Sequence, residues 1–426
     1  MRWTTSTEDR SWFTTTPAAG AADVNLELAA PQRDWQGFGC CFNELGTVAL
    51  NHLSEAKQAE LRQRLFGAGE GDNQLTRCRM PIGANDYATS WYSHADQAGD
   101  HALNSFTTER DAETLFPQVR AAMAINPALS LFVSPWSPPA WLKFPQAHNH
   151  GRLIWDSEHR STYARYLLKA VAAYRAAGLP VDALHVQNEP DSDQKFPSCC
   201  WTGATLRDFI RDDLGPLVER ECPDLALWLG TIERGDHNAW VIPTLVDPEA
   251  RRYCAGVGFQ WAGKAAIPGV HASFPDLPLA QTEHECGNGT NTWDYAHYGF
   301  DLACHYLRNG VTSYCWWNPW LEPGGNSTWG WHQNSLYTID TAGTVTENPD
   351  GVMFRHLCAA GRPGSKVLAT SGSWSANARA WSNSDGSTGL ALHNPIDQDL
   401  RISIAHAGTT ISGELPAHSF HTVVLD

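Results

Sequence analysis

The sequence predicts an α/β fold, namely a (β/α)8 TIM barrel with a smaller antiparallel β side domain formed from both chain termini. Short apolar runs alternate with amphipathic helical patterns through the middle of the chain, which is typical of a parallel sheet with crossover helices. Eight such runs over roughly 320 residues favour a barrel over a doubly wound sheet. The predicted strands cover residues 36–41, 75–81, 129–134, 183–188, 225–230, 256–260, 277–283 and 313–318.

Helices are expected between these strands, because apolar residues there recur with a helical period. For the helix that precedes the fourth strand, Ser161 is the expected N-cap and Gly178 the expected stop. A helix over 53–66 is expected to end at Gly67 in the same way. No glycine-rich phosphate loop follows any strand, which disfavours a nucleotide-binding sheet.

The domain organisation follows from a change of pattern near residue 356. Residues 35–355 are predicted to form the barrel, and residues 356–426 a C-terminal β side domain, because short apolar runs there are separated by Ser, Asn, Asp and Gly. Residues 1–34 are predicted to join the side domain, since 24–28 has the pattern of a strand.

Composition limits the classes of function. The chain has 46 Asp and Glu against 30 Lys and Arg, a net charge of -16, and no basic run, which argues against nucleic acid and anionic membranes as partners. No apolar stretch approaches the roughly 18 residues of a membrane span. The first residues lack an apolar signal core, so we expect a cytoplasmic protein, or a secreted one whose signal peptide is absent from this chain. The sequence indicates no oligomeric state.

Cysteine and histidine give no sign of a metal site. The 11 cysteines lack the paired spacing of zinc ligands, and adjacent pairs such as Cys40-Cys41 and Cys199-Cys200 are expected to be reduced, because neighbouring cysteines bridge only with strain. The 18 histidines include no pair with ligand spacing beside a strand end, so no metal and no cofactor is predicted. The 19 tryptophans suit a sugar-binding cleft, because the faces of pyranose rings stack on aromatic side chains.

Two predicted strands end on a glutamate. Glu189 ends the fourth and Glu283 the seventh. Two carboxyls at the carboxyl ends of parallel strands are what double-displacement glycoside hydrolysis requires, since one protonates the leaving oxygen and the other attacks the anomeric carbon. Pro190 is expected to hold Glu189 in extended geometry, and Asn188 can donate to a sugar 2-hydroxyl. The alternative for Glu189 is a surface ion pair at a strand end.

Glu285 competes with Glu283 for the role of nucleophile. Both side chains would point the same way if the strand continued. The segment Gly287-Asn288-Gly289 soon breaks the pattern, so Glu285 is expected in the loop and Glu283 as the nucleophile.

These motifs together resemble those of glycoside hydrolase family 30, which includes glucosylceramidases, β-1,6-glucanases and some xylan-active enzymes. The resemblance covers most of the chain, and its joint motifs are highly specific. The matching segments are 36–39 (QGFG), 79–83 (RMPIG), 134–141 (SPWSPPAW), 187–190 (QNEP), 281–283 (QTE), 316–318 (WWN) and 354–365.

The resemblance implies a (β/α)8 barrel, a β side domain built from both termini, and hydrolysis with retention of anomeric configuration. It implies Glu189 as the acid/base on strand four and Glu283 as the nucleophile on strand seven. The residues it implies for substrate binding are Arg79, Asp86, Trp136, Asn188, Gln260, Trp261 and Trp317.

Several of these residues carry a second interpretation. Asp86 is expected to hold a sugar hydroxyl, or else to form a turn. Arg79 is expected near a catalytic carboxylate, or else in a structural ion pair. Trp136 and Trp317 are expected as walls of the sugar subsite, or else as core. Gln260 stands where relatives place an aromatic residue or His, so the hydrogen-bonding partner of the nucleophile stays open.

The sequence therefore predicts a retaining β-glycoside hydrolase acting on a β-glucosyl linkage, with a carbohydrate or glycoside as its partner. A xylan- or β-xyloside-active member of the same family is the alternative, which Asp86 disfavours because a pentose offers no C6 hydroxymethyl group to hold. A carbohydrate-binding barrel without catalysis is a further alternative, which the presence of both glutamates disfavours. The aromatic segment 329–332 is expected either to shape a further subsite or to cap the barrel.

Overall fold

Eight parallel strands form a closed barrel in the computed structural model, which describes residues 1–15 and 20–426. They pair in the order β4-β13-β12-β11-β10-β9-β6-β5, and a bridge between Cys41 and Arg79 closes the ring. Every predicted barrel strand is confirmed, with ends that differ by a few residues. The strands are β4 (Gly37–Cys40), β5 (Arg77–Ile82), β6 (Ser130–Pro135), β9 (Val181–His185), β10 (Ala226–Ile232), β11 (Gly256–Gln260), β12 (Leu279–Glu283) and β13 (Val311–Trp316).

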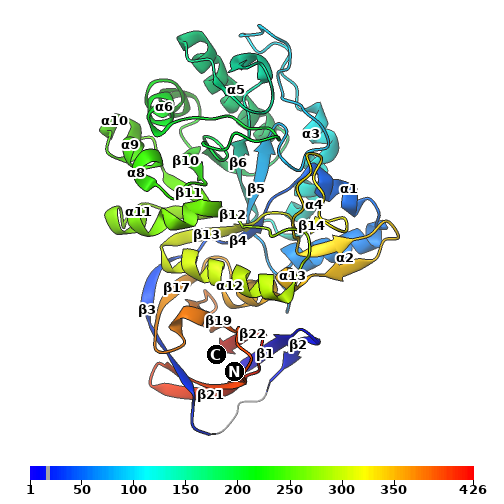
Figure 1. The fold of residues 1–426 in the computed structure, drawn as a ribbon, viewed down its shortest axis with the longest axis vertical. Helices are drawn as coiled ribbons and strands as arrows, with labels where there is room; N and C mark the ends of the chain where they lie inside the picture. The colour runs from blue at the N-terminus through cyan, green and yellow to red at the C-terminus, as the bar shows by residue number, and fades with distance from the viewer. Residues whose placement is uncertain (16–19) are drawn as a thin grey trace.

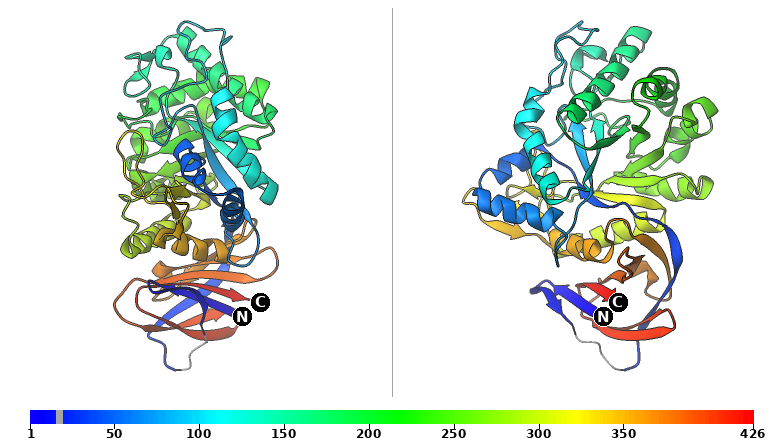
Figure 2. Two further views of the ribbon diagram at one scale, coloured as in Figure 1. Left: turned by 90° about the vertical axis from the view of Figure 1, so that its right-hand side faces the viewer. Right: turned by 180° about the vertical axis from the view of Figure 1, so that it is seen from behind.

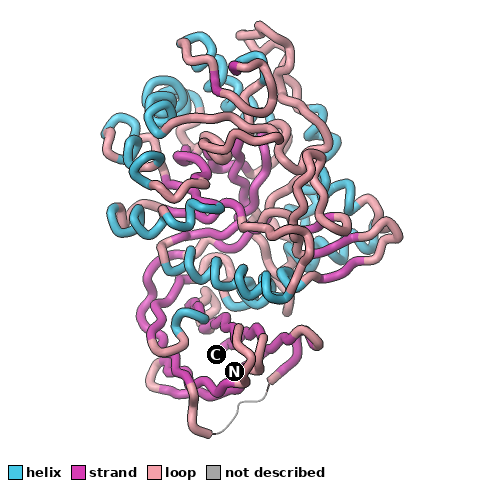
Figure 3. The backbone as a smooth tube through the Cα atoms, viewed as in Figure 1, coloured by secondary structure: helices cyan, strands magenta, loops and turns pink. Residues whose placement is uncertain are grey.

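Helices surround the barrel strands, as the cyan and magenta segments of Figure 3 show. The barrel strands are buried along almost their whole length, because helices cover the outside and side chains fill the inside. The helices are α1 (Glu44–Leu50), α2 (Glu55–Phe66), α3 (Glu109–Thr114), α4 (Phe116–Ile125), α5 (Ser157–Ala176), α6 (Gly203–Phe209), α7 (Gly215–Glu221), α8 (His237–Trp240), α9 (Ile242–Leu245), α10 (Pro248–Arg251), α11 (Ile267–Ser273), α12 (Trp293–Arg308) and α13 (Pro349–Ala360).

The start of α5 differs from the prediction. The helix begins at Ser157, because the Asp156 side chain caps it by accepting the backbone N–H of His159 at 2.9 Å. Ser161 therefore lies inside the first turns, and its prediction as N-cap was wrong. The expected stop holds, since Gly178 follows the helix with a φ of 83°.

A nine-stranded sheet forms the side domain at the lower end of the molecule, where both termini lie (Figures 1 and 2). Its order is β2-β1-β22-β19-β18-β17-β3-β20-β21, so the predicted union of N- and C-terminal strands is confirmed. One pair, β3 with β20, is parallel, and the other named pairs of this sheet are antiparallel. The strands are β1 (Arg2–Thr7), β2 (Arg10–Thr14), β3 (Val24–Asp34), β17 (Lys366–Ser371), β18 (Ala378–Ser382), β19 (Thr388–Asn394), β20 (Leu400–His406), β21 (Thr409–Leu415) and β22 (Ser419–Leu425).

The side domain packs on the barrel through α12 and α13. Phe420 of β22 lies against Phe300 and Trp293 of α12, with ring centroids 6.0 and 5.1 Å away. We keep 1–34, 35–355 and 356–426 as the proposed division of the chain, although residue 355 falls inside α13. Five short strands lie in connections: β7 (Lys143–Phe144), β8 (Arg152–Leu153), β14 (Trp320–Leu321), β15 (Tyr337–Ile339) and β16 (Val345–Glu347).

Within residues 1–15 and 20–426, none of the helices combines the length and the apolar character that crossing a bilayer requires.

Candidate active site

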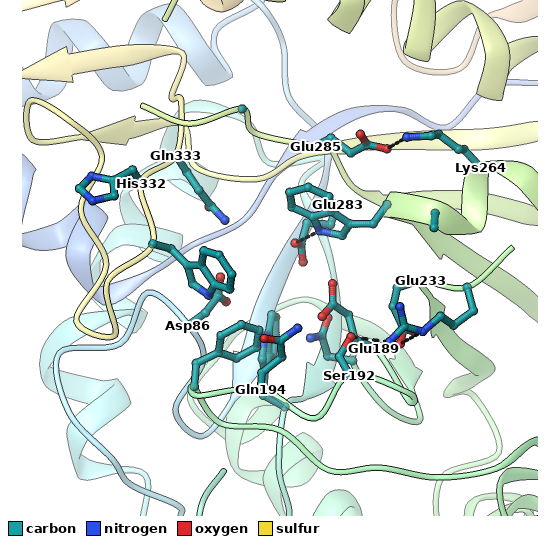
Figure 4. A pocket seen from close by; sticks show the side chains of 18 residues that line it. Asp86, Glu189, Ser192, Gln194, Glu233, Lys264, Glu283, Glu285, His332 and Gln333 are labelled. Atoms are coloured by element: carbon teal, nitrogen blue, oxygen red, sulfur yellow. Dashed lines mark hydrogen bonds and ion pairs between the residues drawn. The ribbon is translucent and has the colours of Figure 1, made fainter. Parts of the chain in front are cut away.

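A cavity of about 510 Å³ opens at the carboxyl ends of the barrel strands. Figure 4 shows side chains from several different loops converging on it. Three of the predicted site residues, Arg79, Gln260 and Trp317, do not line the cavity but are fully buried around it. The predicted residues that do line it are Asp86, Trp136, Asn188, Glu189, Trp261 and Glu283.

Glu283 is the last residue of β12 and is 4% exposed. One carboxyl oxygen, Oε2, accepts hydrogen bonds from Arg79 Nη1 at 2.8 Å and from Gln260 Nε2 at 3.2 Å. The other, Oε1, accepts one from Trp261 Nε1 at 3.0 Å. Donors therefore reach both oxygens, and they stabilise the ionised form of this carboxyl and fix its direction.

Arg79 on β5 is buried beneath the cavity and connects the predicted residues. Its guanidinium donates to Glu283, to Asn188 Oδ1 at 2.7 Å and to Ser134 Oγ at 2.8 Å. It also lies 4.4 Å from the centre of the Trp136 ring, within cation–π range. Arg79 was expected either near a catalytic carboxylate or in a structural ion pair. The structure has both, because the buried ion pair of Arg79 is with Glu283, whose carboxyl lines the cavity.

Glu189 differs from the prediction in its backbone. Strand β9 ends at His185, but a bridge between Asn188 and Thr231 continues the pairing with β10 as far as the site. The φ of Glu189 is 43°, so the prediction of extended geometry was wrong. Pro190 disfavours only the right-handed helical region for its predecessor, and the hydrogen bond from Glu189 N to Thr231 O at 3.2 Å is compatible with the left-handed one. Such conformations are uncommon outside glycine and gather at functional sites.

Gln260 ends β11 and bridges the two glutamates. Its Nε2 lies 3.1 Å from Glu189 Oε1 and 3.2 Å from Glu283 Oε2. Because both distances are to the same nitrogen, those two oxygens lie no more than about 6.3 Å apart, which is shorter than the roughly 6.5–9.5 Å between the carboxyls of inverting glycosidases. The sequence left open which residue hydrogen-bonds Glu283, and the Gln260 amide is one such partner.

The electrostatics of the pair favour an unequal division of charge. Burial raises the pKa of Glu189, and hydrogen bonds from Gln260 and Ser192 oppose that rise. Burial also raises the pKa of Glu283 to about 7, while Arg79 opposes the rise and the charge of Glu189 adds to it. Because Glu283 has donors on both oxygens and an arginine among them, the negative charge is favoured on Glu283 and the proton on Glu189.

Asp86 lies at one side of the cavity and is 4% exposed. Its Oδ1 has no hydrogen-bond partner among the described residues. Burial raises its pKa well above the ordinary value, and the charges of Glu283 and Glu189 raise it further. A buried carboxyl atom without a partner beside a cavity is a site where a ligand hydroxyl can bind.

The two predicted tryptophan walls have different positions. Trp136 lines the cavity, whereas Trp317 lies behind it, stacked on Trp136 with ring centroids 5.6 Å apart. Trp317 therefore does not reach the cavity surface. It packs behind the Trp136 ring and supports it.

Glu285 lies in the loop after β12, as expected. Its two oxygens accept hydrogen bonds from Lys264 Nζ at 2.6 Å and from the Tyr298 hydroxyl at 2.7 Å. The protein therefore already satisfies this carboxyl, unlike that of Asp86.

One lining residue, Glu233, was missed by sequence reasoning. It directly follows β10 and is 3% exposed. The signal was present, since Glu233 is a third glutamate after a barrel strand, but the predicted strand ended at residue 230. Other lining residues that were not predicted are Ser192, Gln194, Phe196, Arg234, Ala262, Lys264, Gly287 and Gln333. Trp331 and His332, from the aromatic segment expected to shape a subsite or to cap the barrel, also line the cavity.

In the part of the chain that the structure describes, no group of three or more His, Cys, Asp or Glu side chains is arranged to hold a metal ion.

Comparison with known families gives two matches. The glycosyl hydrolase family 30 TIM-barrel domain matches residues 35–339, which is well over half of the chain. The glycosyl hydrolase family 30 beta sandwich domain matches residues 364–423.

Two curated relatives are similar along much of the sequence. Lysosomal acid glucosylceramidase of Mus musculus is 28% identical over 326 residues, which cover 70% of this chain and 62% of the mouse protein. The chain thus spans less than two thirds of that relative's length. Endo-1,6-beta-D-glucanase of Neurospora crassa is 24% identical over 424 residues, which cover 92% of this chain and 85% of the fungal protein.

Two solved structures have the same fold. SrfJ from Salmonella typhimurium superposes with a TM-score of 0.88 at 23% identity, covering 99% of this chain and 98% of SrfJ. The endo-beta1,6-glucanase BT3312 superposes with a TM-score of 0.87 at 20% identity, covering 100% of this chain and 99% of that structure.

Proposed function

The chain belongs to glycosyl hydrolase family 30, and from that membership we propose that it cleaves a β-glucosyl linkage by double displacement, with retention of anomeric configuration. The observation that carries the proposal is the pair of buried carboxyls, Glu189 and Glu283, reached by one amide nitrogen of Gln260. The names of the two relatives, a glucosylceramidase and an endo-1,6-beta-D-glucanase, support a glucosyl substrate.

In the first step the Glu283 carboxylate attacks the anomeric carbon, and Glu189 gives its proton to the leaving oxygen. The bond from that carbon to the leaving oxygen breaks while the ester bond to Glu283 forms. The donors around Glu283 support this role, since Arg79 and Trp261 fix the carboxylate before attack. Glu189 has fewer donors and can therefore hold a proton more readily.

In the second step water replaces the leaving group. Once Glu283 is an ester its negative charge is gone, so the pKa of Glu189 falls and its carboxylate can take a proton from the attacking water. The ester bond breaks, and the sugar leaves with its original configuration. Because the two carboxyls share one proton at the start of the cycle, kcat/KM should follow a bell-shaped pH profile.

The sugar specificity is assigned to Asp86 and Trp136. The unpartnered Oδ1 of Asp86 can accept a sugar hydroxyl, and the Trp136 ring at the same cavity can stack on the pyranose face. A glucosyl unit carries a C6 hydroxymethyl group that a xylosyl unit lacks. Asp86 therefore favours the glucoside over the xyloside.

The test uses the purified chain with p-nitrophenyl β-glucoside and p-nitrophenyl β-xyloside. We expect faster turnover of the glucoside, with the first sugar released as the β-anomer in NMR spectra. A 2-deoxy-2-fluoro β-glucoside should label one peptide, the one that contains Glu283, as read by mass spectrometry. An α-anomeric first product, or a label on the peptide that holds Glu189, would contradict the proposal.

A further inference from the structure

A third buried carboxyl lies beside Glu189, on the side of the cavity opposite Asp86. Glu233 is 3% exposed and lines the cavity. Figure 4 shows Asp86 and Glu233 on either side of the Glu189–Glu283 pair. If Asp86 holds the sugar that is attacked, Glu233 is on the side where the leaving group lies, because Glu189 protonates the leaving oxygen between them.

The two oxygens of Glu233 have different surroundings. Oε1 accepts hydrogen bonds from the backbone N–H of Asp191 at 2.9 Å and from the Ser192 hydroxyl at 3.1 Å. Oε2 is buried and has no hydrogen-bond partner among the described residues. Arg234 does not compensate, since its Nε donates to Asp191 at 2.9 Å and is 3.6 Å from Glu233 Oε1. The loop therefore fixes this carboxyl through one oxygen and leaves the other for a ligand.

We propose that Glu233 is a specificity-determining residue that selects a polyhydroxylated leaving group, such as a second sugar, over an alkyl or lipid one. This inference rests on the proposed function and names the substrate class of the same site. A sugar hydroxyl can both donate and accept, so it satisfies Oε2 whether Glu233 is protonated or ionised. An alkyl chain can do neither, and it would cover the oxygen without giving it a partner.

Both protonation states of Glu233 matter near neutral pH. Burial raises its pKa to about 8, and the charge of Glu189 contributes to the rise. A leaving group that offered only a cationic amine would match the ionised form alone. A hydroxyl group matches both forms.

The rim on this side also suits a sugar. It carries the ion pair of Arg234 with Asp191, at 2.9 Å. An aliphatic chain would desolvate these charges without pairing them.

The test compares leaving groups that share one glucosyl unit. Gentiobiose has a glucose leaving group and octyl β-glucoside has an alkyl one, and the ratio of their kcat/KM values is measured for each variant. Glu233→Met removes both oxygens at similar length and should lower this ratio by ~10–100-fold, the loss expected for a buried hydrogen bond to a carboxyl. Glu233→Gln keeps one donor and one acceptor, so its ratio should stay within about fivefold of the wild type.

A matched carboxyl serves as the control. Glu285 lines the same cavity, but Lys264 and Tyr298 already occupy both of its oxygens. Glu285→Gln should therefore leave the gentiobiose-to-octyl ratio unchanged. If Glu233→Met lowers both rates by the same factor, Glu233 only supports the loop around Ser192, and the proposal is wrong.

A measurement on the wild type keeps the proposal testable even if Glu233→Met does not fold. During turnover of p-nitrophenyl β-glucoside, an added acceptor occupies the leaving-group side and competes with water for the ester. Methyl β-glucoside should capture the glucosyl unit more efficiently than 1-hexanol at equal concentration. Preference for hexanol would overturn the inference, whereas no hydrolysis of the aryl glucoside at all would instead overturn the proposed function.

Discussion

The mouth of the barrel and the core of the side sheet both bury titratable side chains, but they satisfy them differently. At the mouth, Asp86 Oδ1 and Glu233 Oε2 have no hydrogen-bond partner within the described residues. Glu189 and Trp261 also have left-handed backbones there, with φ of 43° and 45°. Both features lower stability, and both gather where a protein binds or reacts.

In the side sheet the buried groups include histidines, and the protein itself completes the hydrogen bonds of His421 and His356. In His421 of β22, Nδ1 accepts from the Trp3 indole N–H at 3.2 Å, and Nε2 lies 2.7 Å from Ser419 Oγ. Both ring nitrogens of His356 on α13 also reach hydroxyls, at 2.8 and 2.9 Å. These networks join α13 to the sheet and leave no polar atom of either ring for a ligand.

The two regions should respond to pH with opposite signs. Burial raises the pKa of Glu233 from 4.5 to about 8, so this group stabilises the fold while protonated. Its contribution is full below about pH 4.5 and is lost as the pH rises from there toward 8. Burial lowers the pKa of His421 from 6.5 to about 3, so its contribution is full above about pH 6.5 and is lost as the pH falls toward 3. Raising the pH should therefore destabilise the mouth of the barrel, and lowering it should destabilise the side sheet.

The largest effect is expected from Glu283→Gly at the mouth. Turnover of every substrate should fall by at least about 10⁴-fold, because no ester can form. Azide or formate should fill the vacated space and restore turnover of an activated glucoside, with an α-configured product detected by NMR. Glu285→Gly is the control, and rescue of that variant to an α-product, in place of Glu283→Gly, would mean that the nucleophile has been misassigned.

Glu189→Ala should have a smaller effect that depends on the leaving group. With a natural glycoside kcat/KM should fall by roughly 10²–10⁴-fold, the usual contribution of general acid catalysis. A 2,4-dinitrophenyl glucoside needs little protonation, so its first step should persist, and stopped-flow absorbance should show a burst as the ester accumulates. Azide should relieve the slow second step and give a β-configured product. An α-product from this variant would exchange the roles of the two glutamates.

The barrel strands could be predicted from the sequence because buried parallel strands have nearly continuous apolar runs. The strand end before Glu233 could not. Gly230 has a φ of 134°, and the register between β10 and β11 shifts between Trp228 and Thr231, so an irregularity interrupts a strand that then continues to Ile232. The predicted strand ends at Gly230, two residues before the true end, so Glu233 does not follow it directly in the prediction.

Other parts of the site depend on contacts between distant segments. The left-handed backbone of Glu189 accompanies a hydrogen bond to Thr231 on the neighbouring strand, which local propensity does not contain. The positions of Trp136 and Trp317 are likewise tertiary, since either apolar ring could face the cavity or stand behind the other. The sequence and its family resemblance predicted that Glu189, Glu283, Asp86 and Trp136 lie at one site, and all four line the cavity. The contacts around each of them required the fold.

Asp86→Asn should separate activity from stability within the mouth. Loss of the acceptor charge should lower kcat/KM for the aryl glucoside by roughly 10–100-fold and for the aryl xyloside by less, because the xyloside lacks the C6 hydroxymethyl group. The same change removes a buried carboxyl next to two others, so the free energy of unfolding at pH 7 should rise by about 1 kcal/mol. Urea unfolding followed by tryptophan fluorescence measures the second quantity. If kcat/KM fell equally for both substrates, Asp86 would act by positioning the two glutamates and not by selecting the sugar.

The smallest effect concerns the side sheet and leaves the chemistry untouched. In the folded state Nδ1 of His421 faces the Trp3 donor, so protonation would place a donor against a donor, and the unfolded chain binds that proton instead. Between pH 6.5 and pH 5 this one group should lower the free energy of unfolding by roughly 2 kcal/mol. His421→Gln should be less stable than the wild type at pH 7 but should lose less stability on acidification, by about the same 2 kcal/mol.

Urea unfolding at pH 5, 6 and 7 tests the size of this difference, with His150→Gln as the control because that histidine is exposed. The aryl-glucosidase pH profile of folded His421→Gln should match that of the wild type, since its carboxyls at the mouth are unchanged. If His421→Gln loses stability on acidification as steeply as the wild type, the side sheet does not hold this histidine neutral. If its activity profile shifts instead, the two regions are coupled, and the separation of their buried polar groups fails.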